Sequence, residues 1–151
     1  MLLDQPGAGV HVDYRRENDG ETLHFWTGAK SLPEIRIDWS ALSRDERTAE
    51  HFGARFLCAA VLACYTNTFS NALLREGATI RSLAARASIK MEKDAIFRTH
   101  YTRILLELEV SLGEGDDAAL RTVQEELEMG SLVTYSLPQG IEVEHDIRRV
   151  A

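Results

Sequence analysis

Residues 51–74, HFGARFLCAAVLACYTNTFSNALL, decide the fold of this chain. Between Phe52 and Tyr65 the stretch has one charged residue, Arg55, and no proline, so a helix formed here is apolar on nearly every face. Such a helix must be covered on all sides by protein. Its apolar run ends at Thr66, short of the roughly 20 residues that a membrane span needs. We therefore expect a core helix and no membrane partner.

Length and charge limit what the protein can be. With 151 residues the chain is long enough for one domain and too short to predict two, so we expect a single domain over residues 1–151. A net charge of -7 argues against a nucleic-acid partner, because nucleic-acid-binding proteins present Lys and Arg to phosphates. The same charge argues against binding to an anionic membrane surface.

The two cysteines, Cys58 and Cys64, lie six residues apart on the expected helix. This spacing separates them by about 9 Å along the helix axis, whereas a disulfide needs Cα atoms within about 7 Å of each other. They therefore cannot pair with each other in a helix. The first ten residues, MLLDQPGAGV, contain no secretory signal. Free thiols without an export signal predict a cytoplasmic location.

Alternation of apolar and polar residues predicts strands on both sides of the helix. The segments with this two-residue period are 10–16, 22–27, 34–39, 79–91, 103–110 and 141–147. The first three, with an Asp19-Gly20 turn signal, predict a three-stranded antiparallel meander. The next two are joined by a short charged turn near residues 92–95 and predict a long hairpin. The last segment predicts a final strand.

Capping residues set the expected ends of the main helix. Ser43, with Glu46 three residues later, has the spacing of a capping box, so the helix begins there or one turn later at Thr48. Gly77 provides the residue at which a left-handed helix stop forms. The sequence therefore predicts one continuous helix of about 28 residues, which is long for a globular protein.

A second helix is expected after the hairpin. Asp116 or Asp117 can cap a helix over residues 118–129, which ends at Gly130, and residues 131–137 add one or two helical turns. The expected order is β-β-β-α-β-β-α-(α)-β, which is an α+β fold class.

This order, together with the stretch AAVLACYTNTFSNALLREGATI at residues 59–80, resembles the OsmC/Ohr family of thiol-dependent hydroperoxide reductases. In that family an apolar helix carries the reactive cysteine in the setting A-A-x-x-x-C-[FY], here residues 59–65. The resemblance covers roughly residues 45–147. It implies an OsmC-like fold, with antiparallel sheets wrapped around a long central apolar helix, in an intertwined homodimer. A second subunit would also supply the cover that the apolar helix requires.

The resemblance implies roles for several residues. It places Cys64 as the peroxidatic thiol, which reduces a small organic hydroperoxide to an alcohol and is restored by an external thiol reductant. The family's arginine near the thiol comes from the first hairpin, where Arg15 or Arg16 could serve.

Two departures from the family pattern change the expected chemistry. Ser131 takes the place of the resolving cysteine, so no intrasubunit disulfide can close a catalytic cycle. The glutamate near the start of the family helix is missing as well, because Ala54 takes its place.

Each thiol also has a purely structural interpretation. Cys64 is either a reactive thiolate or a small buried hydrophobic residue. Cys58 is expected to pack in the core, but Arg55 lies three residues before it on the same face and could activate it as a second thiol site. The structural interpretation, which is the favoured one, is that Arg55 forms an ion pair with Glu50 or with an acid from the other subunit.

Two functions therefore stay open. The first is a one-cysteine, thiol-dependent organic hydroperoxide reductase acting in oxidative stress defence. The second is a non-catalytic homodimer of the same fold that binds a small apolar molecule. We expect no metal site, because the five histidines are scattered singly, and no sequence motif indicates a cofactor.

Overall fold

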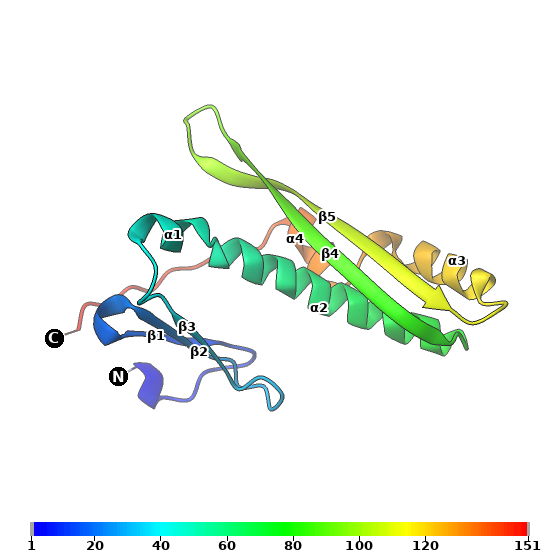
Figure 1. The fold of residues 1–151 in the computed structure, drawn as a ribbon, viewed down its shortest axis with the longest axis horizontal. Helices are drawn as coiled ribbons and strands as arrows, with labels where there is room; N and C mark the ends of the chain where they lie inside the picture. The colour runs from blue at the N-terminus through cyan, green and yellow to red at the C-terminus, as the bar shows by residue number, and fades with distance from the viewer. Residues whose placement is uncertain (1, 151) are drawn as a thin grey trace. The chain divides into compact units, whose positions relative to one another are not determined.

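The single long helix expected from the sequence is interrupted at His51 and forms two helices instead. In the computed structural model (Figure 1), α1 (Arg44–Ala49) ends before His51 and α2 (Phe52–Arg75) begins after it. His51 has a φ of 48°, in the left-handed region that a right-handed helix cannot include. The prediction of one continuous helix is therefore wrong.

The same point divides the chain into two compact units, Met1–His51 and Phe52–Ala151. The structure describes residues 2–150, without the side chains of Leu2 and Met129. The single domain expected over residues 1–151 stays a prediction.

The first unit contains the expected meander. Strands β1 (Asp13–Glu17), β2 (Thr22–Trp26) and β3 (Glu34–Asp38) pair antiparallel in the order β1-β2-β3. A short 3-10 turn, η2 (Asn18–Gly20), joins the first two strands, and another, η1 (Leu2–Asp4), lies near the start of the chain. The predicted three-stranded meander is confirmed.

The capping box predicted at Ser43 is confirmed as well. The Glu46 amide donates to Ser43 Oγ at 3.2 Å, and the Ser43 amide donates to Glu46 Oε2 at 2.7 Å. One of these bonds satisfies an amide that a helix start leaves unpaired, and the other fixes the entry of the chain. The spacing located the start of a helix correctly, although that helix, α1, is only six residues long.

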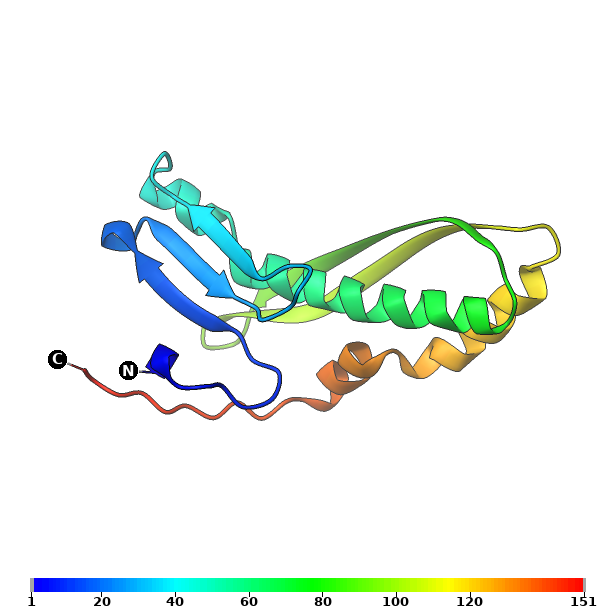
Figure 2. The ribbon, with the colours of Figure 1, turned by 90° about the horizontal axis from the view of Figure 1, so that it is seen from below.

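The second unit is built along α2. Strands β4 (Ile80–Lys93) and β5 (Thr99–Leu112) form the predicted long hairpin, which runs beside α2 (Figure 1). The hairpin turn occupies residues 94–98, slightly later than expected. The chain continues through α3 (Asp117–Glu126), η3 (Leu127–Met129) and α4 (Leu132–Gln139), and both α helices pack against α2 (Figure 2).

The buried core of the second unit joins α2, the hairpin and α3. Leu73 and Val123 are completely buried, and Phe69, Ala72 and Ala78 pack with them. Burying one large apolar side chain contributes about 1.5–3 kcal/mol to folding. This cluster therefore fixes the carboxyl-terminal half of α2 against the hairpin and α3.

Gly77 ends α2 as predicted. The residue has a φ of 81°, which glycine adopts without strain. The Ala78 amide donates to the Leu73 carbonyl at 3.0 Å, and the Gly77 amide donates to the Leu74 carbonyl at 3.1 Å. These two bonds form a Schellman motif, which pairs carbonyls that the helix end would otherwise leave free.

Asp116 precedes α3 but does not cap it with its side chain. Its carboxylate instead accepts hydrogen bonds from the amides of Thr79 and Gly113, at 2.9 and 3.0 Å. Asp116 therefore ties together the two ends of the β4–β5 hairpin. The prediction that the Asp116 carboxylate caps this helix is therefore wrong.

The final strand expected at residues 141–147 is not formed. Residues 141–150 belong to no strand, and their apolar side chains are exposed, with Ile147 at 91%. Alternation gives a segment the pattern of a strand, but a strand also needs a hydrogen-bonded neighbour. No strand of the described chain provides one at this segment, so the predicted β-strand at the end of the order is wrong for the single chain.

One side of α2 stays exposed in the single chain. Only five of its 24 residues are buried, and the exposed ones include the small residues Ala59, Ala60 and Ala63. By length and composition the stretch Arg44–Arg75 could also cross a membrane, a test that core helices of soluble proteins pass too. The expectation of no membrane partner stays a prediction.

Candidate functional site

The site is built around Cys64, which lies near the middle of α2 and is half-buried. Helix α4 packs against α2, the helix that carries Cys64. Both elements belong to the second unit, so one compact part of the chain forms this site.

The sequence around Ser131 explains why α4 starts beside the thiol. Gly130 has a φ of 84°, which turns the chain out of η3, and Ser131 then adopts the extended backbone of an N-cap. The Ser131 amide donates to Thr134 Oγ1 at 2.6 Å, and the Thr134 amide donates to Ser131 Oγ at 3.5 Å. The result is a capping box in which threonine takes the part usually played by glutamate or glutamine.

Hydrogen bonds lower the pKa of the Cys64 thiol below its ordinary value. The largest cause is the Ser131 side chain, followed by the backbone amide of Val133. Partial burial acts in the opposite direction, and the backbone amide of Leu132 adds a smaller lowering. The amides of a first helical turn carry the positive end of the helix dipole, so they favour a negatively charged sulfur.

The two arginines predicted for the site lie in the first unit. Arg16 Nε donates to the Gly20 carbonyl at 2.9 Å, and its guanidinium lies over the Trp39 ring, 5.7 Å from the centroid. Arg15 is exposed on β1, opposite His24 in the sheet register. A role for Arg15 or Arg16 at Cys64 stays a prediction, whereas the hydrogen bonds from α4 are given by the second unit itself.

Cys58 and Arg55 lie about two turns and about two and a half turns earlier on α2. Cys58 is half-buried and Arg55 is exposed, and both cysteines are free thiols. The expected activation of Cys58 by Arg55 stays a prediction, and so does an ion pair between Arg55 and an acid.

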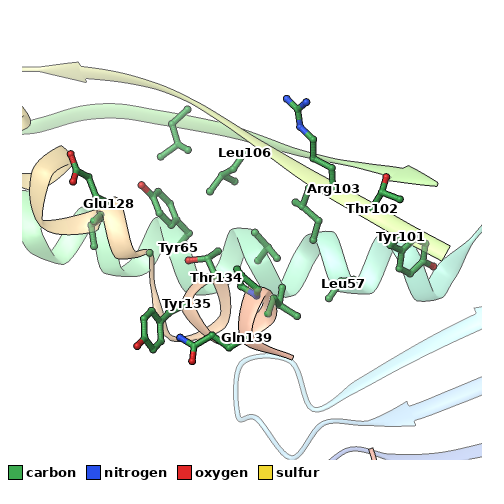
Figure 3. Close-up of a pocket in the computed structure, with 17 residues that line it drawn as sticks. Leu57, Tyr65, Tyr101, Thr102, Arg103, Leu106, Glu128, Thr134, Tyr135 and Gln139 are labelled. Atoms are coloured by element: carbon green, nitrogen blue, oxygen red, sulfur yellow. The ribbon is translucent and has the colours of Figure 1, made fainter. Parts of the chain in front are cut away.

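A groove of about 950 Å³ lies between α2, β5 and α4 (Figure 3). Apolar side chains make up much of its wall, namely Leu57, Val61, Leu106, Leu108, Leu127 and Leu137. Tyr65, Thr134 and Glu128 give polar groups at one end, and Tyr101, Thr102 and Arg103 lie toward the other (Figure 3). Cys64 does not line the groove, but its neighbour Tyr65 does, as do Gly130 and Thr134 on either side of Ser131.

Sequence reasoning missed two parts of this site. It identified Ser131 only as the position of an absent cysteine, although the serine side chain is the largest cause of the lowered pKa of Cys64. It also missed the groove, whose lining spreads from residue 57 to residue 139. The Ser-x-x-Thr spacing ahead of the expected helical turns was the one available signal for a helix start at residue 131.

Within residues 2–150, no group of three or more His, Cys, Asp or Glu side chains is placed to hold a metal ion. The expectation of neither a metal nor a cofactor stays a prediction.

Comparison with known proteins identifies the fold. No protein-family model matches the sequence, and no curated protein sequence matches it. The structure is similar to that of an OsmC-like protein of unknown function from Vibrio cholerae, with a TM-score of 0.56 over 87% of this chain and 93% of the other. The chain has an OsmC-like fold. At 10% sequence identity the likeness shows the fold alone.

The OsmC-like fold confirms the α+β architecture predicted from the sequence, with a long helix and antiparallel sheets. It leaves the activity, the roles of the site residues and the homodimer as predictions.

Proposed function

We propose that the protein is a thiol-dependent organic hydroperoxide reductase acting in oxidative stress defence, with Cys64 as the peroxidatic thiol. The observation that carries the proposal is the lowered pKa of the Cys64 thiol, whose largest cause is hydrogen bonding by the Ser131 side chain. A peroxidatic cysteine must be a thiolate, because the thiolate and not the thiol is the nucleophile. The OsmC-like fold supports the same conclusion, since thiol chemistry is what the resemblance implies.

The reaction proceeds by attack of the thiolate on the distal oxygen of the hydroperoxide. A sulfur–oxygen bond forms, the O–O bond breaks, and the leaving alkoxide takes a proton from water to become the alcohol. Cys64 is thereby oxidised by two electrons to a sulfenic acid. An external thiol then condenses with the sulfenic acid, releasing water, and a second one reduces the mixed disulfide to restore the Cys64 thiol.

The reductant must come from outside because neither nearby candidate can resolve the sulfenic acid. Ser131 has no sulfur, and Cys58 lies about 9 Å away along the same helix. Arg15 and Arg16 remain the candidates for a cation near the thiolate.

The proposed protein is a cytoplasmic homodimer. The exposed small residues Ala59, Ala60 and Ala63 leave one side of α2 without cover in the single chain, and a second copy would bury it.

The function is tested by the consumption of cumene hydroperoxide with dithiothreitol as reductant. We expect the wild-type protein and Cys58→Ser to consume the peroxide at similar rates, and Cys64→Ser to have no activity above the buffer. Equal consumption by the wild-type protein and Cys64→Ser would contradict the proposed function.

A second function has its own support, because Cys64 is not among the residues that line the groove. In this alternative the protein is a non-catalytic OsmC-like dimer that holds a small apolar molecule in the groove. Binding of the fluorescent probe 1-anilinonaphthalene-8-sulfonate would then be retained by Cys64→Ser and weakened by Leu106→Asn. Peroxide consumption that depends on Cys64 would decide in favour of the reductase.

A further inference from the structure

We propose that residues 141–147 form a strand that pairs with the free edge of β4 in a second copy of this chain. The proposal goes beyond the thiol chemistry and rests on the proposed homodimer, of which it specifies one interface. Two features of the second unit carry it, namely an unpaired segment with the pattern of a strand and a long strand with an unpaired edge. The side chains of the two match in both polarity and charge.

The segment that follows α4 has its apolar side chains in solvent. Ile141, Val143 and Ile147 are 62%, 71% and 91% exposed. Acidic residues stand between them, at positions 142, 144 and 146. A strand with this alternation buries one face and leaves the other in solvent. Within the described residues 2–150 no strand pairs with the segment, so a neighbour from another chain is needed to bury its apolar face.

Strand β4 has a long free edge. It pairs with β5 on one side, and no other strand of the described part of the chain pairs with it. The two register shifts of the hairpin skip Arg81 and Thr102, so β4 runs without interruption from Ser82 to Lys93. An edge of this length presents unpaired backbone amides and carbonyls, which favours the addition of another strand.

Charge favours β4 over β5, whose outer edge is free as well. Leu83 and its partner Val110 pack against the core, so the residues next to them in each strand lie on the opposite, outer face of the hairpin. On β4 these outer residues are Ala84, Arg86, Ser88 and Lys90. On β5 they are Arg103, Leu105, Glu107 and Glu109. An acidic segment therefore meets two cations on β4 and would meet two carboxylates on β5.

One antiparallel register matches both faces of the two strands. Glu142 then lies opposite Lys90, and four residues later Asp146 lies opposite Arg86. The pairs on the other face are Ile141–Met91, Val143–Ile89, His145–Ala87 and Ile147–Ala85. A shift by one residue would move the acids to the apolar face, and a shift by two would lose one of the two ion pairs. Parallel pairing could keep the charges matched but is less stable per residue.

The ion pair that Lys90 already forms does not prevent this pairing. Lys90 Nζ lies 2.8 Å from Glu92 Oε1, but both side chains are largely exposed. An exposed ion pair contributes little to stability, so Lys90 can exchange it for Glu142 of a second copy.

The added strand would extend the sheet face that borders the groove. Ile89 and Ala87 are the register partners of Ile104 and Leu106, which line the groove. A second copy would place its Val143 beside Ile89 and so continue this apolar face by one strand. In a two-fold dimer each copy gives one strand and receives one.

The test is disulfide cross-linking of the full chain in a Cys58→Ser, Cys64→Ser background. Ser88→Cys combined with Glu144→Cys replaces two exposed side chains that face each other in this register, within the roughly 7 Å that a disulfide allows. We expect mild oxidation to give a species of twice the chain mass on a non-reducing gel, lost on reduction. The matched control combines Ala84→Cys with Glu144→Cys. Its thiols would lie about 13 Å apart along the strand and should not cross-link.

Charge reversal tests the register. In the Ser88→Cys, Glu144→Cys protein we expect Lys90→Glu to slow cross-linking by roughly threefold, because like charges directly opposite each other are unfavourable. Adding Glu142→Lys should restore the rate. Adding Asp146→Lys instead should not, because that lysine would face Arg86.

Two gel results would overturn the proposal. One is a product of single-chain mass with an internal disulfide, which would place the segment on its own β4, and the other is equal cross-linking of the control pair. Light scattering of the wild-type protein separates this proposal from the homodimer. A dimer without cross-linking would leave the homodimer standing and rule out the strand pairing, whereas a monomer would contradict both.

Discussion

At the scale of single residues, hydrogen bonding by the Ser131 side chain is the largest cause of the lowered pKa of Cys64. A serine at this position gives a donor to the thiolate and cannot form a disulfide with it. Ser131 is buried, and the backbone amides of Val133 and Leu132 also lower the pKa of the Cys64 thiol. Two measurements follow from this hydrogen bonding.

Changing Ser131 to cysteine tests the proximity directly. Hydrogen bonding by the Ser131 side chain is the largest cause of the lowered pKa of Cys64, so we expect Ser131→Cys to form an intrachain disulfide with Cys64 on mild oxidation. Intact-protein mass spectrometry in a Cys58→Ser background would show the loss of two hydrogens, reversible with dithiothreitol. Ser136→Cys, on a later turn of α4, is the matched control and should stay reduced. Oxidation of both variants to the same extent would contradict the placement.

The lowered pKa of Cys64 also makes stability depend on pH. A thiol whose pKa is lower in the folded state stabilises the fold once pH exceeds the folded value, and this contribution is lost as pH falls through that value. We expect the wild-type protein to gain stability over Cys64→Ser as pH rises from 6 toward the ordinary range of a thiol. Thermal unfolding of both proteins across this range measures the difference. A constant difference in melting temperature would show that the thiol is not perturbed.

At the scale of elements, the start of α4 depends on Gly130. Its φ of 84° disfavours any side chain, and a Cβ there would collide with Thr134 Oγ1 of the capping box. Gly140 has a similar φ of 81° at the other end of α4, but a Cβ there meets no atom within 4 Å. Comparing alanine variants of the two glycines therefore distinguishes the cost of backbone strain from the cost of disrupting the capping box.

We expect Gly130→Ala to destabilise the protein by about 1–3 kcal/mol, from strain at a positive φ together with loss of the cap. Gly140→Ala carries only the backbone strain and should cost less. Chemical denaturation of both variants measures the free energy of unfolding. The reactivity of Cys64 toward alkylation should also fall more in Gly130→Ala than in Gly140→Ala. Equal effects of the two variants would show that the contact with Thr134 is unimportant.

The elements also show how far the sequence could be read. Alternation located β1 to β5, and the residues Ser43 and Gly77 marked a helix start and a helix end, because these signals are local. The break at His51 was missed, since a positive φ is uncommon at any residue other than glycine. The strand at residues 141–147 was wrong because pairing depends on a neighbour that sequence alternation does not contain.

The site was predictable only in part for the same reason. Cys64 stood out through the motif around it, and its position on α2 is confirmed. The effect of Ser131 on Cys64 involves residues that are far apart in the chain, and threonine in place of glutamate or glutamine hid the capping box at Ser131. The groove depends on the packing of α4 against α2 and β5, which no local pattern specifies.

At the scale of the whole molecule, the open side of α2 supports the proposed homodimer. Small residues allow two helices to approach closely, and Ala63 is exposed at the centre of that side. We expect Ala63→Glu to convert the dimer to a monomer, because a carboxylate would be buried without a partner. Light scattering after size-exclusion chromatography measures the mass. Ala118→Glu, an exposed alanine in the first turn of α3, should remain dimeric. A wild-type protein that is already monomeric would contradict the dimer.

The junction of Cys64 with α4 has a further consequence, because coupling between two sites is reciprocal. If the first turn of α4 favours a charged sulfur, then a charged sulfur favours the folded first turn of α4 by the same free energy. Oxidation to a neutral sulfenic acid removes that charge and with it part of what holds the helix start in place. The oxidation state of the Cys64 sulfur would thus change the stability of α4. Three residues of this helix, Thr134, Tyr135 and Leu137, form part of the groove wall. The wall of the groove would then differ before and after the thiol has reacted.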